Sequence, residues 1–363
     1  MAYPLTPVPY SLATADGYLT KTDKARRFHY LTKNVENAAL PDLATCLTVE
    51  IPGNFHQICK KVFEVMVKSS DVVFSTDQYF PDSVKSVERR RRGCAEKLTV
   101  QGPMTKRPAD WKLLITNGAN KAQLIKLLLC VWSQDDFAHA YQDRKVIFIS
   151  EGKAHSLETD DQAHTTVQEV ESLSSNHEET DSRVVLYCKY ACDQGYESVR
   201  ICSPDSDVFF VLLHHTSSLS CAVLFDTGTG NNRRLINMTD LVADFTQEYC
   251  TALTALHAFT HCDSTSTFKG IVKVKPLKVL QKNPRFERVL ARLREEWTPA
   301  DDVLAGLEAF TCAMYGRNRL TSVNQFQYML ISEKCGWKDG KLNPKRNVDF
   351  CSLPPCQEGS HAT

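Results

Sequence analysis

Short apolar runs and longer amphipathic stretches alternate along most of this chain. Apolar runs of strand length lie at 71–77, 145–150, 199–203 and 221–225. Helical periodicity marks 54–68, 120–132, a segment that begins at 178–181, 239–250 and 252–260. Strands that alternate with helices are typical of a mainly parallel sheet. We therefore predict an α/β fold with a mainly parallel sheet flanked by helices.

Changes in composition suggest where the parts of the chain begin and end. Residues 1–60 form an N-terminal segment without a clear period, and 61–265 form the predicted α/β domain. Within that domain, the polar stretch 151–176 is predicted to be a long loop or a weakly ordered insertion. Residues 266–337 are predicted to be a helical region, and the polar residues 338–363 a poorly ordered tail.

Charge and cysteine content narrow the function classes only a little. The chain has 43 basic and 43 acidic residues, so its net charge does not by itself indicate a nucleic-acid-binding protein. It has 14 cysteines but no Cys-x-x-Cys pair, and we expect buried, reduced thiols. No signal peptide and no apolar run of about 18 residues is present. We therefore expect an intracellular protein of the nucleus or cytoplasm that does not span a membrane.

The acidic residues carry most of the functional information, because they follow strands or begin helices. Asp77, Asp205 and Asp207 come directly after apolar runs, Glu179 and Asp181 begin a helix, and Asp263 follows an apolar helix. In a parallel α/β sheet these positions share one edge. Two carboxylates about 4 Å apart repel each other by about 4 kcal/mol at an effective dielectric constant near 20. A cluster of them therefore needs a cation, and carboxylate oxygens suit Mg²⁺ or Mn²⁺.

Ordinary structural roles remain open for several of these residues. Acids at a helix start are commonly caps that accept backbone N–H groups. The segment 226–230 contains two glycines but lacks a phosphate-loop pattern, so we predict a hairpin turn. The basic run 89–92 is either a phosphate contact, a nuclear localisation patch or a solvated helix face.

The order of these acids resembles that of flap endonucleases and their PIN-domain relatives. The resemblance rests on Glu179-Thr-Asp181, then Ser203-Pro-Asp205-Ser-Asp207, then Asp263 in a Cys-Asp-Ser turn. It implies a PIN-like (flap-endonuclease-like) fold in which Glu179, Asp181, Asp205, Asp207 and Asp263 bind one or two Mg²⁺ or Mn²⁺ ions. It also implies that Asp77 assists them and that Lys85 and Arg92 grip the scissile phosphate.

Two further segments carry the same resemblance. Residues 268–280 resemble the helix-hairpin-helix that holds duplex phosphates in that group, and the helical region 266–337 is expected to begin with it. Residues 256–268 are similar to a signature of a set of uncharacterised animal proteins of this type.

Two positions depart from the pattern of that family. The hairpin's second glycine is replaced by Val272, and valine does not readily adopt a positive φ. The family also opens with an apolar strand that ends in an acid, and the first 60 residues show no clear match. The nearest apolar stretch, 47–51, carries Glu50 rather than Asp. We therefore expect a divergent or truncated copy whose cleavage is weak or absent.

Three functions remain open at this point. The first is a metal-dependent, structure-selective nuclease that hydrolyses phosphodiester bonds of DNA or RNA. The second is a catalytically inactive PIN-like module that binds nucleic acid or a protein partner. The third is an α/β interaction domain in which the acids are only helix caps.

Overall fold

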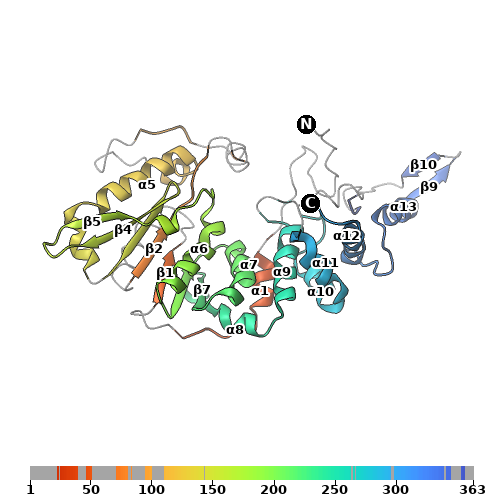
Figure 1. The fold of residues 1–363 in the computed structure, drawn as a ribbon. Coiled ribbons are helices and arrows are strands. Elements are labelled where there is room, and N and C mark those ends of the chain that lie inside the picture. The colour runs from red at the N-terminus through yellow and green to blue at the C-terminus, as the bar shows by residue number, and fades with distance from the viewer. Residues whose placement is uncertain are drawn as a thin grey trace. The chain divides into compact units, whose positions relative to one another are not determined.

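The computed structural model divides the chain into two units, which Figure 1 shows as ribbons. It describes residues 23, 25–39, 46–50, 71–80, 83, 95–99, 110–142, 144–262, 265, 267–295, 298–338, 341–344 and 353–355. We call Val35–Leu241 the sheet unit, and Met1–Asn34 together with Val242–Thr363 the helical unit. Each unit has a hydrophobic cluster of its own.

The sheet unit holds eight strands in the hydrogen-bonded order β5-β4-β3-β2-β1-β6-β7-β8. Their bounds are Cys46–Glu50 (β1), Asp71–Ser75 (β2), Val146–Ser150 (β3), Lys153–Thr159 (β4), Thr165–Glu169 (β5), Ser198–Cys202 (β6), Ala222–Thr227 (β7) and Arg234–Asn237 (β8). The central strands β3, β2, β1, β6 and β7 run parallel to one another. The outer strands β4, β5 and β8 each run antiparallel to the strand before them in the chain.

The prediction of a single, mainly parallel, PIN-like sheet was wrong. β1 separates a group of four strands from a group of three, and both groups are mixed. Three of the five described pairings within these groups are antiparallel, namely β3 with β4, β4 with β5, and β7 with β8. Short connections join these three pairs, whereas parallel neighbours need a crossover of about a dozen residues or more. The chain is therefore an α/β protein with two small mixed groups of strands and a helical C-terminal region.

The prediction of a long loop or weakly ordered insertion over 151–176 was also wrong, because this segment forms β4 and β5. β3 turns into β4 through Glu151 and Gly152, whose φ angles are 49° and 81°. Positive φ at both central residues is the signature of the type I′ turn that suits a β-hairpin. Only Ala154, Ser156 and Leu157 of β4 are buried, and β5 has no buried residue. Few apolar positions therefore mark the two strands.

Several predicted elements are confirmed where the structure describes them. The strands predicted at 145–150, 199–203 and 221–225 are β3, β6 and β7. The predicted helices correspond to α5 (Gly118–Trp132) and α6 (Thr180–Asp193), and the apolar stretch after Asp207 is α7 (Ser206–His215). The helical segments predicted at 239–250 and 252–260 correspond to α8 (Met238–Ala243) and α9 (Gln247–Phe259), so their boundaries differ from the prediction. The helix predicted at 54–68 lies outside the described residues.

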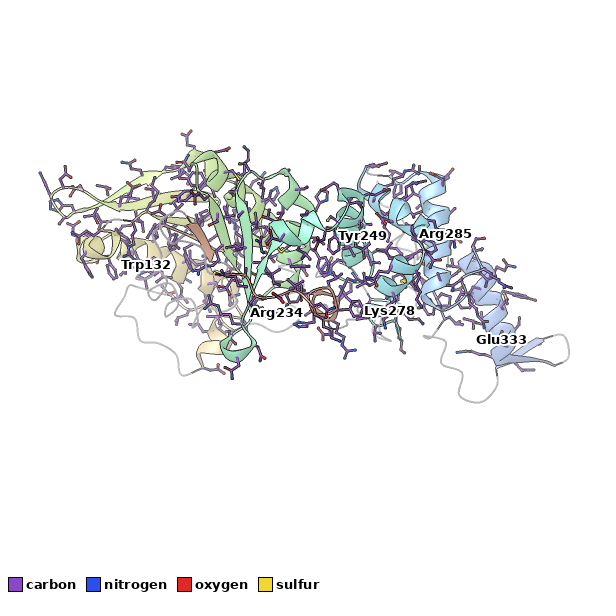
Figure 2. All side chains as sticks on the ribbon, turned by 90° about the horizontal axis from the view of Figure 1, so that it is seen from below. Trp132, Arg234, Tyr249, Lys278, Arg285 and Glu333 are labelled. Carbon is purple, nitrogen blue, oxygen red and sulfur yellow. The ribbon has the colours of Figure 1, made fainter. Side chains whose placement is uncertain are left out.

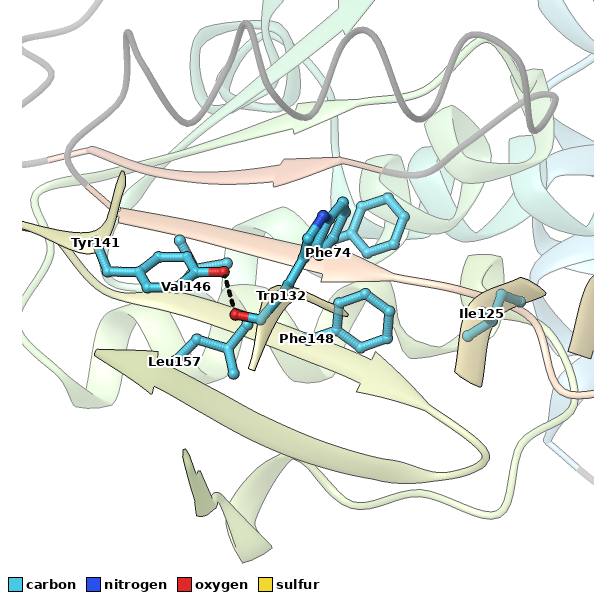
Figure 3. Packing of buried hydrophobic residues seen from close by; sticks show 7 residues of the cluster. All are labelled: Phe74, Ile125, Trp132, Tyr141, Val146, Phe148 and Leu157. Atoms are coloured by element: carbon cyan, nitrogen blue, oxygen red, sulfur yellow. Dashed lines mark hydrogen bonds between the residues drawn. The ribbon is translucent and has the colours of Figure 1, made fainter. Parts of the chain in front are cut away.

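Helices α5 and α6 cover opposite faces of β2. On one face, Phe74 of β2 and Phe148 of β3 are paired in register, and Trp132 of α5 packs edge-on against both rings (Figure 3). The Tyr141 hydroxyl donates a hydrogen bond of 2.8 Å to the Trp132 carbonyl. Ser75, the next residue of β2, instead contacts the Tyr187 hydroxyl of α6. Successive strand side chains point to opposite faces, so the sheet is buried on both sides here.

The helical unit is built from helices that pack around α12. Its described elements are α1 (Ala25–Leu31), α9, α10 (Val274–Lys282), α11 (Arg285–Ala291), α12 (Asp301–Met314) and α13 (Val323–Lys334), then the hairpin β9 (Cys335–Lys338) and β10 (Lys341–Pro344). The predicted tail therefore starts inside a hairpin. Phe310 of α12 contacts the rings of Phe259 and Phe286, which lie on α9 and α11. These aromatic side chains form the contact between the helices.

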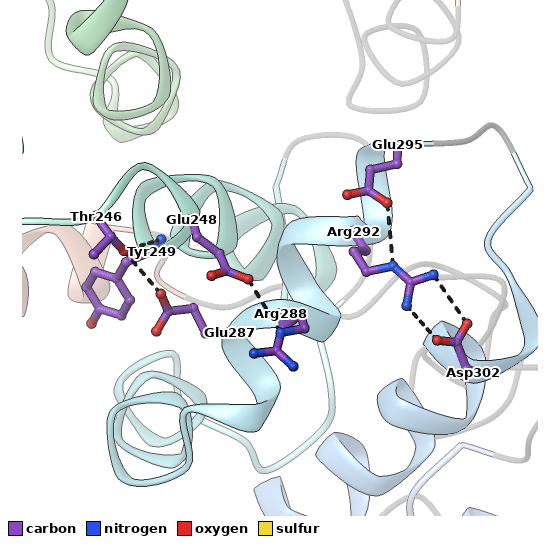
Figure 4. A network of polar contacts seen from close by, with 8 residues as sticks. All are labelled: Thr246, Glu248, Tyr249, Glu287, Arg288, Arg292, Glu295 and Asp302. Atoms are coloured by element: carbon purple, nitrogen blue, oxygen red, sulfur yellow. Dashed lines mark hydrogen bonds and ion pairs between the residues drawn. The ribbon is translucent and has the colours of Figure 1, made fainter.

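Polar side chains at the surface tie α9, α11 and α12 together. Thr246 caps α9 by accepting from Tyr249 N, and its hydroxyl also lies 3.2 Å from Glu287 of α11 (Figure 4). Arg292, just after α11, forms ion pairs with Glu295 and with Asp302 of α12. All of these groups are at least partly exposed, so each pair contributes at most about 1 kcal/mol.

Among the described helices, none combines the length and the apolar character that crossing a membrane requires.

Candidate functional site

The parallel strands of the sheet unit carry acidic residues at or just after their carboxyl ends. Asp77 follows β2, Glu50 ends β1, Asp205 follows β6, and Asp226 lies near the end of β7. β2, β1, β6 and β7 are successive neighbours in the sheet and run in the same direction. Their carboxyl ends therefore lie side by side along one edge, which we call the acidic edge.

Asp77 fixes the start of α6 to the end of β2. One oxygen of its carboxylate accepts a hydrogen bond of 3.0 Å from Thr180 N, the first residue of α6. Thr180 is flanked by Glu179 and Asp181, and both of these acids are half-buried. The predicted ligands Glu179 and Asp181 are thus attached to the segment that holds Asp77.

Gln78 holds the polypeptide that leads into α6. Its side-chain amide donates hydrogen bonds of 2.9 Å to the carbonyls of Ser175 and His177, and its own N–H donates to the Glu178 carbonyl. Gln78 is buried, so these bonds are shielded from water. The backbone before Glu179 is therefore positioned by three hydrogen bonds from one residue.

A buried cation lies beneath the same helix start. Arg183 is 1 % exposed, and its guanidinium donates to the Thr76 carbonyl at 2.5 Å and to the Thr180 hydroxyl at 3.2 Å. Its positive charge lies in a low-dielectric environment between β2 and α6, where charge–charge interactions are weakly screened. Arg183 therefore links the end of β2 to the first turn of α6.

The second pair of predicted ligands lies at the start of α7. Asp205 is the N-cap, and its carboxylate accepts a hydrogen bond of 2.9 Å from Asp207 N. The Ser203 hydroxyl accepts from Asp205 N at 3.1 Å, and Ser203 N donates to the Asp226 carbonyl. Asp205 and Asp207 are both half-buried. This chain of bonds connects the turn after β6 to β7.

Sequence reasoning missed Asp226, which was assigned only to a hairpin turn. Asp226 is 6 % exposed and makes a bidentate ion pair with Arg233, at 2.9 Å to Nε and 2.5 Å to Nη2. Arg233 neutralises this carboxylate, so its role is to join β7 to β8 rather than to bind a ligand. The signal was present, because Asp226 ends an apolar strand as Asp77 does.

The first 60 residues show no clear match to an apolar strand that ends in an acid, yet they do contain a strand. Residues 46–50 form β1, which lies between β2 and β6 and is parallel to both. Glu50 is aligned with Phe74 on one side and with Cys202 on the other. The backbone position for an acid on the central strand is therefore occupied by a glutamate.

Three predicted site residues, Lys85, Arg92 and Asp263, lie outside the described residues. Among the residues that are described, no three His, Cys, Asp or Glu side chains gather closely enough to hold a metal ion together. The acids on β2, α6 and α7 still match Mg²⁺ and Mn²⁺ in donor chemistry, since all of them offer carboxylate oxygens.

The helical unit presents a basic stripe of its own. The segment that resembles a helix-hairpin-helix forms a turn at 268–272 and then α10, with α9 before it. Gly270 has φ of 78°, but Val272 does not have a positive φ, so valine is unstrained there. Lys275, Lys278 and Lys282 of α10 are exposed and recur at helical spacing, and Figure 2 labels Lys278. In the described part of the chain none of the three makes an ion pair.

The chain matches no protein-family model, no curated protein and no solved structure.

Proposed function

We propose that this chain is a metal-dependent nuclease that hydrolyses phosphodiester bonds of DNA or RNA at the acidic edge. The observation that carries the proposal is the strand order, which brings the ends of β2, β1 and β6 side by side. Each of these ends, or the helix next to it, bears at least one acid: Asp77, Glu179, Asp181, Glu50, Asp205 and Asp207. Acids from separate segments at one sheet edge are the usual setting of a functional site in α/β proteins.

In this proposal some residues bind the cation, and others hold the start of α6 in place. Glu179 and Asp181 at the start of α6, or Asp205 and Asp207 at the start of α7, would each offer a pair of carboxylates to Mg²⁺ or Mn²⁺. Asp77 and Gln78 orient the start of α6 through the bonds to Thr180, Ser175 and His177. A divalent cation bound at such a site activates a water molecule and stabilises the leaving oxygen of a phosphodiester.

The basic stripe on α10 supports nucleic acid as the substrate class. Lys275, Lys278 and Lys282 are exposed on one helix face, and none of them makes an ion pair among the described residues, although Lys278 Nζ lies over the Tyr30 ring. Arg292, in contrast, is neutralised by Glu295 and Asp302 (Figure 4). Unpaired lysines bind backbone phosphates and release counterions, which supplies affinity that does not depend on sequence. The proposal therefore assigns backbone binding to α10 and chemistry to the acidic edge.

Cleavage by the purified chain tests the proposal. Labelled flap, single-stranded and RNA substrates are incubated with Mn²⁺, and Asp205→Asn is compared with the wild type. Asparagine keeps an oxygen that can accept the bond from Asp207 N, so the variant removes charge but preserves the helix cap. Asp193→Asn, at the exposed far end of α6, is the matched control.

We expect cleavage that is weak in the wild type, absent in Asp205→Asn and unchanged in Asp193→Asn. Equal cleavage by the Asp205→Asn variant would mean that the activity comes from elsewhere.

Nucleic-acid binding is tested separately with the triple variant Lys275→Ala, Lys278→Ala and Lys282→Ala. Its affinity for any nucleic acid should fall, and the slope of log K against log salt should shrink by roughly one unit for each lost phosphate contact. Lys189→Ala is the control, because Lys189 is exposed but paired with Asp193. If the slope of log K against log salt is unchanged in the triple variant, α10 does not contact the nucleic-acid phosphates.

A second candidate function is a non-catalytic module that binds nucleic acid or protein. One observation favours it: Asp77 and Asp205 each use one carboxylate oxygen to cap a helix. Caps stabilise a helix without any metal. Binding that is retained without cleavage, and that does not respond to Mn²⁺, would support this module over the nuclease.

A further inference from the structure

Three cysteines meet where α6 ends and β7 begins. Cys188 and Cys192 lie one turn apart on α6, and Cys221 immediately precedes β7. The Cys192 thiol contacts the Cys221 sulfur at an S···S distance of 2.9 Å, and neither cysteine forms a disulfide. Cys221 also lies 3.9 Å from the Cys188 carbonyl. Two reduced thiols from different elements are thus already in contact in the folded protein.

The thiols of Cys192 and Cys188 differ in pKa. Partial burial alone would raise the pKa of Cys192, but hydrogen bonds involving Cys221 and Ser220 outweigh it and lower the pKa. Full burial raises the pKa of Cys188 well above its ordinary value. The thiolate is the reactive form of cysteine, so Cys192 reacts ahead of Cys188. Cys192 is also only half-buried, and a small oxidant can reach it.

We propose that Cys192 and Cys221 form a reversible disulfide when the protein meets a peroxide. The Cys192 thiolate attacks one peroxide oxygen, the O–O bond breaks, and hydroxide leaves and takes up a proton to become water. Cys192 is now a sulfenic acid. The Cys221 sulfur then attacks the Cys192 sulfur, the S–OH bond breaks, and a second water is released as Cys221 loses its proton. Two thiols are oxidised and one hydrogen peroxide is reduced to two waters.

The disulfide would close a loop that contains β6 and α7. Cys192 and Cys221 are 29 residues apart in the sequence, and Asp205 and Asp207 lie between them. A cross-link here restricts the unfolded chain and holds the turn after β6 between two anchored ends. The redox step itself does not depend on the proposed nuclease activity.

Peptide mapping of the full chain tests the proposal. The protein is treated with hydrogen peroxide, remaining thiols are alkylated, and the digest is analysed by mass spectrometry without reduction. We expect a peptide pair joined through Cys192 and Cys221, which dithiothreitol separates. Cys192→Ser should abolish the cross-link. Cys130→Ser should keep it, because Cys130 is an exposed free thiol on α5.

Alkylation of the wild-type protein tests the proposal without depending on whether a variant folds. Iodoacetamide should alkylate Cys192 ahead of Cys250 and Cys312, whose pKa values burial raises to about 11. After peroxide treatment, iodoacetamide in denaturant should alkylate neither Cys192 nor Cys221, because both sulfurs are in the disulfide. A bond from Cys192 to Cys188, or sulfinic acid at Cys192 without any cross-link, would overturn the proposal.

Discussion

Replacing Gly152 by alanine should destabilise the sheet unit far more than the same change at Gly195. Both glycines have left-handed backbones, with φ of 81° and 79°. A β-carbon in that region of φ costs about 1–2 kcal/mol of stability. Part of this cost is offset, because alanine has less conformational entropy than glycine in the unfolded chain. At Gly195 a β-carbon meets no atom within 4 Å, so we expect a cost of about 1 kcal/mol.

At Gly152 the same β-carbon would lie 2.6 Å from the Ser175 carbonyl oxygen. Ordinary contact begins at 3.4 Å, so one of the two segments must move by about 0.8 Å (3.4 minus 2.6). That oxygen accepts from Gln78, and Ser175 N donates to the Gly152 carbonyl at 2.9 Å. Each hydrogen bond contributes about 1 kcal/mol, so Gly152→Ala should cost about 3 kcal/mol.

Urea denaturation followed by circular dichroism measures both variants against the wild type. We expect the two variants to differ by about 2 kcal/mol, which corresponds to a difference in Tm of about 4–8 °C for a unit of this size. Hydrogen exchange should locate the loss of protection at β3, β4 and the segment before α6. Equal costs for the two substitutions would refute the packing of the β3–β4 turn against Ser175.

Two further predictions concern single buried or capping groups. Asp77→Ala should lower the free energy of unfolding by about 1 kcal/mol in the presence of a chelator, because the hydrogen bond to Thr180 N is lost. Asp77→Asn keeps an oxygen that can accept this bond and should lower the free energy of unfolding by only a few tenths of a kcal/mol. Equal losses for the two variants in urea titrations would show that the charge of Asp77, and not its capping bond, stabilises the protein. Arg27→Met should leave the free energy of unfolding unchanged or raise it. Arg27 is fully buried, and burial lowers its pKa to about 9. Two of its nitrogens have no hydrogen-bond partner among the described residues. The exposed neighbour Arg26→Met is its control, and a loss above about 2 kcal/mol for Arg27→Met would contradict the prediction.

The elements with strong apolar patterns were predictable from the sequence. β3 is buried along its whole length, and α5 and α6 each bury an apolar stripe, so runs and periods in the sequence reveal them. The antiparallel strands β4 and β5 were not predictable in this way, because their buried side chains are few and small. Glu151-Gly152 is the local signal that was overlooked, since a two-residue turn after an apolar strand favours a hairpin.

The positions of the acids in the candidate site were predictable for the same physical reason. Acids after apolar strands or at helix starts identify Asp77, Glu179, Asp181, Asp205 and Asp207, and the structure places these residues at strand ends and helix starts. Glu50 was undervalued because a strand of five residues followed by Pro-Gly gives a weak signal. The contact between Cys192 and Cys221 depends on where the end of α6 lies relative to the residue before β7, and no local pattern in the sequence predicts that.

Calorimetric titration with Mn²⁺ tests the central claim most directly, because it measures cation binding without requiring catalysis. The wild-type chain should bind Mn²⁺ specifically, and Mg²⁺ should compete. The double variant Asp205→Asn, Asp207→Asn should lose that binding, while Asp193→Asn should keep it. Identical titrations for the wild type and the double variant, or no binding at millimolar Mn²⁺, would contradict a metal site at the acidic edge.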